Sequence, residues 1–176
     1  ESDRQRAMDA LKICHEKLAG GKSRRARLSA TEACRAAENG EEFRARVREE
    51  TGLELEIVDR QTEARLAVSG CGTLVTRETD AVVLFDIGGG SSEIALIDVS
   101  QRRSPRLAAH ITAWTSLPAG VVTLAERFGG RNVTPARFGP MVDHVTALLS
   151  GLAERHCLGT LTVGSLSHPL VTSGTV

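Results

Sequence analysis

The sequence predicts an α/β protein, and three observations support that class. Segments with helical spacing of apolar residues alternate along the chain with short segments of strand character. An unbroken apolar run at residues 81–85 is typical of a strand covered on both faces. The 176 residues are 41% hydrophobic, which is enough to bury a sizeable core in one full domain or in two small or incomplete ones.

The first part of the chain contains four predicted helices and two predicted strands. Ala7, Leu11 and Leu18 recur at helical spacing, and the glycines at 20 and 21 end that first helix. Alternation of apolar and charged residues predicts a strand with one solvated face around residue 55. The expected order is a helix to residue 19, a strand at 27–30, helices at 31–38 and 41–51, a strand at 53–58 and a helix at 62–71.

The second part is expected to be a β-meander followed by helices. Strands at 81–85 and 94–99 are joined by a glycine loop and form a hairpin, and a third strand is predicted at 107–114. The remaining predictions are a helix at 120–128, a helix from 134 or 140 to 156, and short strands at 161–163 and 170–172. A polar connection before residue 80 places a domain boundary there, which gives domains 1–79 and 80–176.

Composition excludes several classes of partner. Lys and Arg number 22, as do Asp and Glu, so the formal net charge is zero and exerts no general pull toward DNA or an anionic membrane. Tyrosine is absent and tryptophan occurs once, which argues against a stacking platform for single-stranded nucleic acid. No apolar run approaches the roughly 20 residues that cross a bilayer. We therefore expect neither a DNA partner nor a membrane partner.

The four cysteines lie far apart and form no Cys-x-x-Cys pair, so neither a zinc ribbon nor a redox dithiol is encoded. Free buried thiols are the expected state. The five histidines likewise lack the spacing of metal ligands. With no leader-like segment at the start of the sequence, these features favour a reducing, cytoplasmic setting.

The loop between the two hairpin strands, DIGGGSSE at residues 86–93, carries the strongest chemical signal. Three consecutive glycines cost about 0.5–1 kcal/mol each relative to alanine, so something is expected to approach the backbone closely. Successive amides and the hydroxyls of Ser91 and Ser92 suit a phosphoryl group. Asp86 and Glu93, at the two ends of the loop, supply hard oxygen ligands for Mg²⁺, directly or through water.

Other interpretations of this loop fit less well. A plain glycine-rich hairpin with two solvated carboxylates explains the turn but not an acid at both ends. The loop is not followed by Gly-Lys-Ser/Thr, as a P-loop requires, and a strand rather than a helix comes next, unlike a dinucleotide fingerprint. A phosphate and Mg²⁺ site is therefore the favoured interpretation.

Five blocks follow one another along the chain. They read ATEACR with AENG at 30–35 and 37–40, TEARL at 62–66, DIGGGSSE at 86–93, SLPAGVV at 116–122 and TSGTV at 172–176. In this order they resemble the exopolyphosphatase and guanosine pentaphosphate phosphohydrolase (Ppx/GppA) family. The resemblance implies two ribonuclease-H-like domains of the actin, sugar-kinase and heat-shock ATPase superfold, with a cleft in which water cleaves phosphoanhydride bonds and Mg²⁺ is bound.

The resemblance also implies roles for particular residues. Glu63 resembles the general base that orients the attacking water, and Asp86 and Glu93 resemble the carboxylates of the metal site, with Asp86 also counted as catalytic. A second set resembles groups that face the phosphates: Arg35, the amides of Gly88, Gly89 and Gly90 with Ser91, and a further loop of Ser173, Gly174 and Thr175. Such groups meet the needs of phosphoryl transfer, which are charge neutralisation and in-line positioning.

Two departures from the family pattern bear on these expectations. The family's first glycine–serine loop has no counterpart here and the second domain stops early, so the chain resembles the tail of one domain and the front of another. The isolated 176 residues are therefore expected to show little turnover, and an exposed apolar surface is expected to permit a homodimer. The block before the general base usually reads Gly-x-Glu-Glu-Ala-Arg, whereas residues 60–65 read RQTEAR, which bears on substrate preference and base strength.

The expected function of the intact parent is release of terminal phosphate from polyphosphate, from guanosine pentaphosphate or from both. A non-catalytic module that binds a phosphate-rich polymer or alarmone is the alternative from another class. A sugar-kinase-like ATPase is a third interpretation, less favoured because the TEARL block is not a kinase feature.

Overall fold

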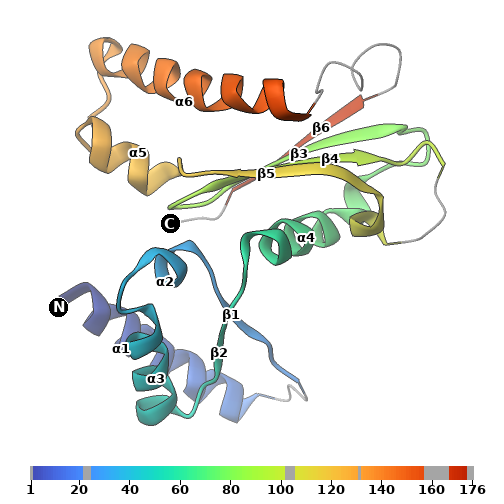
Figure 1. Ribbon diagram of the computed structural model, residues 1–176. Helices are drawn as coiled ribbons and strands as arrows, with labels where there is room; N and C mark the ends of the chain where they lie inside the picture. The colour runs from blue at the N-terminus through green and yellow to red at the C-terminus, as the bar shows by residue number, and fades with distance from the viewer. Residues whose placement is uncertain (1, 22–24, 102–105, 131, 157–166, 174–176) are drawn as a thin grey trace. The chain divides into compact units, whose positions relative to one another are not determined.

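The computed structural model describes residues 2–21, 25–101, 106–130, 132–156 and 167–173. The chain divides into two compact units, Glu1–Arg60 and Gln61–Val176 (Figure 1). The predicted strand at 161–163 lies outside the described residues, as does Cys157. None of the described helices is both long and apolar enough to span a membrane.

The first unit packs three helices around a short parallel pair of strands. Its elements are α1 (Ser2–Gly20), β1 (Leu28–Ala30), α2 (Glu32–Ala36), α3 (Gly40–Thr51) and β2 (Leu55–Ile57). β1 and β2 run parallel, with Leu28 opposite Leu55. Met8 of α1 and Val47 of α3 are completely buried and meet Leu53 in the core of this unit. The helical periodicity of α1 and α3 therefore places one apolar face of each helix in this core.

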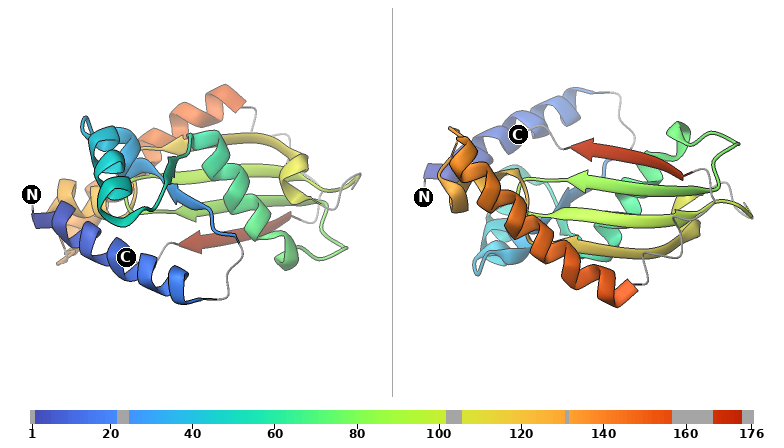
Figure 2. Two further views of the ribbon diagram at one scale, coloured as in Figure 1. Left: turned by 90° about the horizontal axis from the view of Figure 1, so that it is seen from below. Right: turned by 90° about the horizontal axis from the view of Figure 1, so that it is seen from above.

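The second unit is built on a mixed four-stranded sheet in the order β5-β4-β3-β6 (Figure 2). The strands are β3 (Ala81–Ile87), β4 (Ser92–Asp98), β5 (Ile111–Leu117) and β6 (Ser167–Ser173). β3, β4 and β5 are antiparallel neighbours, which confirms the predicted meander, and β6 lies parallel to β3 on its other side. A parallel neighbour needs a crossover, and the helices between β5 and β6 supply it.

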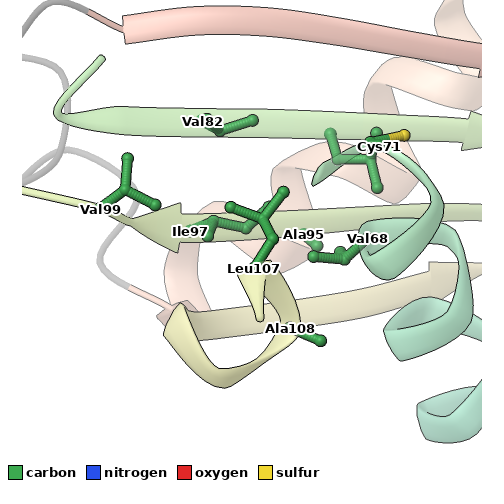
Figure 3. Close-up of a cluster of buried hydrophobic side chains, with 9 residues drawn as sticks. Val68, Cys71, Val82, Ala95, Ile97, Val99, Leu107 and Ala108 are labelled. Atoms are coloured by element: carbon green, nitrogen blue, oxygen red, sulfur yellow. The ribbon is translucent and has the colours of Figure 1, made fainter. Parts of the chain in front are cut away.

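The two faces of this sheet are covered by different helices. α4 (Arg60–Gly70) lies on one face, and α6 (Pro135–His156) crosses the other (Figures 1 and 2). On the α4 face, Val68 and Cys71 pack on a row of apolar side chains from the strands, shown in Figure 3. Leu84, 2% exposed, and Ala95, also 2% exposed, are directly paired members of that core. Alternation along β3 and β4 therefore decides which side chains face α4.

Helix α5 (Val121–Phe128) begins directly after the SLPAG segment and ends at Gly129, whose φ of 96° is in the left-handed region that glycine favours. α6 begins at Pro135, one residue after the earlier of the two predicted starts, and Pro140 lies inside it. Proline at the first helical position is favoured because its missing N–H would have no intrahelical partner there.

One prediction about an element boundary needs correction. Residues 107–110 form a 3₁₀ turn (Leu107–His110), in which the N–H of Ala109 donates to the carbonyl of Arg106 three residues earlier, and the strand begins only at Ile111. The compact units divide after Arg60, because α4 and the following 3₁₀ turn (Gly72–Leu74) belong with the sheet of the second unit. The boundary between the two ribonuclease-H-like domains stays a prediction.

Candidate active site

Four polar side chains form one row across the sheet of the second unit. Asp86 of β3 is directly paired with Glu93 of β4 and with Thr172 of β6, and Glu93 is directly paired with Ser116 of β5. Directly paired residues project from the same face of a sheet. Asp86 lies two residues beyond Leu84, so this acidic row (Ser116, Glu93, Asp86 and Thr172) is on the face that α4 covers.

Each carboxylate of the acidic row accepts a hydrogen bond from a hydroxyl on a neighbouring strand. The Oγ of Ser116 donates to Oε1 of Glu93 over 2.7 Å. The Oγ1 of Thr172 donates to Oδ1 of Asp86 over 2.7 Å. The two outer strands thus hold the two acids of the central hairpin in fixed orientations.

Burial raises the pKa of Glu93 above its ordinary value. The residue is 3% exposed, and loss of water disfavours its charged form. Hydrogen bonds from Ser116 and Ser91 favour the charged form, but the negative charges of Glu63 and Asp86 add to the upward shift. Glu93 therefore takes up a proton more readily than an exposed glutamate.

Glu63 stands in the first turn of α4 and is half-buried. Ala64 and Val68, which follow it on the same helix, are buried. The charge of Glu63 acts on Glu93, so the structure brings the predicted general base into the electrostatic neighbourhood of the acidic row. Three of the predicted acids, Glu63, Asp86 and Glu93, therefore belong to one site in the second unit.

The glycine loop joins β3 to β4 at the end of the acidic row. Gly88, Gly89 and Gly90 are half-buried, and the backbone N–H of Gly88 donates to the carbonyl of Ser91 over 2.9 Å. The Gly88 amide thus closes the turn, and the cradle of three amides stays a prediction. The amides of Gly89 and Gly90 have no acceptor within the described part of the chain.

The serines after the glycines have partners inside the protein. Ser91 is buried and its side chain hydrogen-bonds to Glu93, and its role toward phosphate stays a prediction. The Oγ of Ser92 donates to the carbonyl of Ala119 over 2.5 Å. Both hydroxyls therefore anchor the loop to its surroundings.

Arg35 lies in α2 of the first unit, where its guanidinium has protein partners. Nη1 donates to the carbonyl of Val58 over 2.6 Å, and Nη2 donates to the carboxylate of Glu32 over 2.6 Å. Burial alone would raise the pKa of Glu32, but hydrogen bonds from Arg60 and Arg35, with their charges, outweigh it and lower that pKa. These contacts give Arg35 a structural role in its own unit, and its role toward phosphate stays a prediction.

The predicted phosphate loop after β6 begins at the edge of the described region. Ser173 is the last residue of β6 and is paired with Ile87. Gly174 and Thr175 lie outside the described residues.

The donor set fits Mg²⁺ in part. Among the described residues, no group of three or more His, Cys, Asp or Glu side chains is arranged to hold a metal ion. Mg²⁺ in phosphoryl-transfer sites commonly takes one or two carboxylates and completes its shell with water and substrate oxygens. The half-buried carboxylate of Asp86 suits that use. Glu93 suits only a contact through water, because it is buried and is hydrogen-bonded by two hydroxyls.

Sequence reasoning assigned no role to Ser116, Thr172 or Gly120, although all three lie within the quoted blocks. Ser116 and Thr172 are the donors of the acidic row, and their place depends on strand register, which single-sequence patterns do not reveal. Gly120 lies against the glycine loop, where a Cβ would come 2.5 Å from the carbonyl oxygen of Gly88. The one feature of the sequence that indicates a special role for Gly120 is its position at the start of a predicted helix.

The mixed four-stranded sheet, with its crossover to a parallel fourth strand, belongs to an α/β chain of the actin-like ATPase fold, which the solved Ppx/GppA structure described below shares. The chain belongs to the Ppx/GppA phosphatase family, whose sequence profile matches residues 1–165. The predicted family and fold class are thereby confirmed.

Two relatives illustrate this membership, and one further structure shares the fold. A guanosine-5'-triphosphate,3'-diphosphate pyrophosphatase of Photobacterium profundum is 27% identical over 186 residues, which cover 99% of this chain and 35% of that protein. The crystal structure of the Ppx/GppA family member of Aquifex aeolicus is 28% identical with a TM-score of 0.61, covering 86% of this chain and 47% of that one. An exopolyphosphatase structure from Cytophaga hutchinsonii is 23% identical with a TM-score of 0.82, covering 99% of this chain and 52% of that one. The chain thus spans about a third of the curated relative and about half of each solved structure.

Proposed function

We propose that the full-length protein hydrolyses phosphoanhydride bonds and releases terminal phosphate from inorganic polyphosphate, from guanosine pentaphosphate or from both. The observation that carries the proposal is the pairing of Asp86 with Glu93 beside a glycine loop, with the charge of Glu63 acting on the same site. Family membership supports hydrolase chemistry, and the names of the relatives cited above supply the two candidate substrates.

Glu63 is the residue we assign to the attacking water. A carboxylate that accepts a hydrogen bond from water orients its lone pair for in-line attack and receives its proton. Glu93 lies directly beside Asp86 and is held by the hydroxyls of Ser116 and Ser91, so we assign it the role of positioning the acidic row rather than of contacting the attacking water.

Asp86 is the residue we assign to hold Mg²⁺, with Glu93 reaching it only through water. When bound, the ion would neutralise charge on the phosphate oxygens. The hydrogen bond from Thr172 leaves the second carboxylate oxygen of Asp86 for that role.

The backbone amides of Gly89 and Gly90 are the donors we assign to the phosphoryl oxygens. Both belong to a half-buried loop, and both lack an acceptor within the described residues. Backbone amides suit a substrate built from repeated phosphates because they bind oxygens without regard to the rest of the molecule.

The test is phosphate release by the full-length protein with Mg²⁺, using polyphosphate and guanosine pentaphosphate side by side. We expect Glu63→Gln, which keeps the shape of the side chain, to lower kcat by about 10²–10⁴-fold. Glu49→Gln, at an exposed carboxylate of α3, is the matched control and is expected to leave kcat unchanged. Tight binding of either substrate without turnover by the wild type would instead indicate a non-catalytic binding module.

A further inference from the structure

The first turn of α5 is hydrogen-bonded to the glycine loop. The backbone N–H of Val121 donates to the carbonyl of Gly88 over 3.0 Å. The carbonyl of Gly89 accepts from the N–H of Val122 over 2.8 Å and from that of Thr123 over 3.2 Å. The first amides of a helix have no partner inside the helix, and here the loop carbonyls satisfy them.

These bonds decide which way the loop amides face. A trans peptide unit is planar, and its C=O and N–H point in opposite directions. The described residues contain no cis peptide bond. Since the carbonyl of Gly88 points at α5, the N–H of Gly89 points away from it, and the bonds to the Gly89 carbonyl turn the N–H of Gly90 away in the same manner.

The same bonds strengthen the two amides as donors. A peptide group whose carbonyl accepts a hydrogen bond is polarised, and chains of hydrogen bonds reinforce one another in this way. The carbonyl of Gly89 accepts two bonds from a helix N-terminus, where the helix dipole is positive. The positive end of the α5 dipole thereby polarises the peptide group between Gly89 and Gly90, which makes the N–H of Gly90 a stronger donor on the opposite side of the loop.

The close approach of α5 to the loop requires glycine at position 120. A Cβ on Gly120 would lie 2.5 Å from the carbonyl oxygen of Gly88 and closer still to that of Gly89. Gly120 is buried, and its N–H donates to Oγ1 of Thr123 over 2.8 Å. Its backbone is extended (φ −130°, ψ −179°), so absence of a side chain rather than unusual dihedrals is what this site demands.

We infer that α5 aims and polarises the amides of Gly89 and Gly90 toward a phosphoryl group, and that Gly120 and the N–H of Val121 are positioning elements for that group. This inference rests on the proposed function for the ligand, but it concerns residues outside the acids and the loop itself. Within the SLPAGVV block, Gly120 and Val121 thus support the loop that binds the phosphoryl group, without contacting that group themselves.

Val121→Pro tests the inference at one hydrogen bond. Val121 is the first residue of α5, where proline is favoured, and the extended Gly120 is compatible with a following proline. The substitution replaces the N–H that reaches Gly88 with a ring CH₂, which removes the hydrogen bond and pushes the Gly88 carbonyl away, while the first helical position itself accepts proline. Val121→Ala, which removes most of the same exposed side chain but keeps the N–H, is the control.

The measurements are made on the full-length protein: the Kd for tripolyphosphate by calorimetry, kcat and KM for phosphate release, and the melting temperature. For Val121→Pro we expect tripolyphosphate binding and kcat/KM to fall by about tenfold or more, with a melting temperature near that of the wild type. The pH profile of kcat is expected to keep its shape, because the acids are untouched. Val121→Ala is expected to match the wild type throughout.

Gly120→Ala is the second variant, with Gly139→Ala as its control, because a Cβ at Gly139 meets nothing within 4 Å. We expect Gly120→Ala to lose tripolyphosphate binding by a larger factor than Val121→Pro. Normal binding and turnover by Val121→Pro, in a wild type that hydrolyses its substrates, would overturn the inference and leave the proposed function standing. Weakened binding by both variants in a protein that binds tripolyphosphate without cleaving it would support the inference and count against hydrolysis. A wild type that neither binds nor cleaves would contradict both.

Discussion

Asp86 and Glu93 occupy directly opposed positions on β3 and β4 and project from the same face of the sheet. Like charges in such positions repel and destabilise a hairpin. The protein offsets the repulsion with hydroxyl donors from both outer strands, Thr172 to Asp86 and Ser116 to Glu93. A pair of acids held in this unfavourable arrangement is typical of a functional site rather than of a structural hairpin.

Glu93→Gln is expected to change how stability depends on pH. The pKa of Glu93 in the folded protein lies above its ordinary value of 4.5, so the native state binds the proton more tightly than the unfolded state. The stabilisation from this proton is complete below pH 4.5 and is lost as the pH rises through the folded pKa. Glu93→Gln removes that decline, and we expect the variant to be at least as stable as the wild type at neutral pH.

Thermal unfolding of the full-length protein from about pH 4 to about pH 8 checks this expectation. Glu49→Gln serves as the control and should follow the wild-type profile. An unchanged pH profile in Glu93→Gln would mean that the raised pKa of Glu93 does not contribute to stability.

Ser116→Ala is expected to destabilise the protein by about 1–3 kcal/mol, because it leaves the buried carboxylate of Glu93 with one hydrogen-bond donor fewer. Chemical denaturation measures this loss. The loss should be smaller in a Glu93→Gln background, where the acceptor is a neutral amide oxygen, and a loss of equal size in both backgrounds would show that Ser116 stabilises the sheet in another way.

Leu84→Ala is expected to cost about 2–5 kcal/mol, since Leu84 is 2% exposed in the core beneath α4 and its removal leaves a cavity. Leu66→Ala provides the matched control, because Leu66 lies on the outer side of α4 and is 43% exposed. Chemical denaturation compares the two variants. A similar loss of stability in both variants would contradict the structure, in which the side of α4 that carries Leu66 faces away from the sheet.

Arg35→Ala is expected to destabilise the first unit by about 1–3 kcal/mol, because Glu32 and the carbonyl of Val58 lose a charged donor. The pKa of Glu32 is lowered in the folded protein, so its stabilisation is complete above pH 4.5 and is lost as the pH falls through the folded pKa. The melting temperature of wild type and variant should therefore converge in acid. Arg27→Ala, which breaks an exposed pair with Glu56, is the control. A gap that stays constant down to about pH 3 would contradict this account.

The thiols are expected to differ in reactivity. Burial and the charge of Asp86 raise the pKa of the Cys71 thiol, and the residue is 4% exposed, whereas Cys14 lies exposed on α1. Iodoacetamide followed by mass spectrometry should modify Cys14 first and Cys71 only under unfolding conditions. Early modification of Cys71 would indicate that α4 opens readily from the sheet. The expectation that the thiols are buried holds for Cys71 and is wrong for Cys14.

Most elements were predictable because their signals are local. Helical spacing located α1, α3 and α6, and the glycine hairpin located β3 and β4. The sequence predicts a strand at Leu107 and Ala108, whereas they form a 3₁₀ turn, because a short apolar run occurs in both kinds of element. The homodimer and the cytoplasmic location remain predictions from the sequence.

The sequence predicts the acidic residues of the candidate site, but it does not predict the residues that hold those acids and the glycine loop in place. Asp86 and Glu93 flank the loop in sequence, so their neighbourhood could be expected. Ser116 and Thr172 reach them only through the register of β5 and β6, and that register depends on long-range pairing. The close contact of Gly120 with the loop likewise arises from tertiary packing and has no local signature.

The most direct test of the central claim is Mg²⁺-dependent phosphate release by the full-length protein carrying Asp86→Asn. This substitution keeps the size of the side chain and an acceptor for Thr172 but removes the charge assigned to the metal. We expect kcat to fall by at least about 10²-fold and the Mg²⁺ concentration needed for half-maximal rate to rise, with the melting temperature preserved. Wild-type turnover and an unchanged Mg²⁺ requirement in Asp86→Asn would contradict the account.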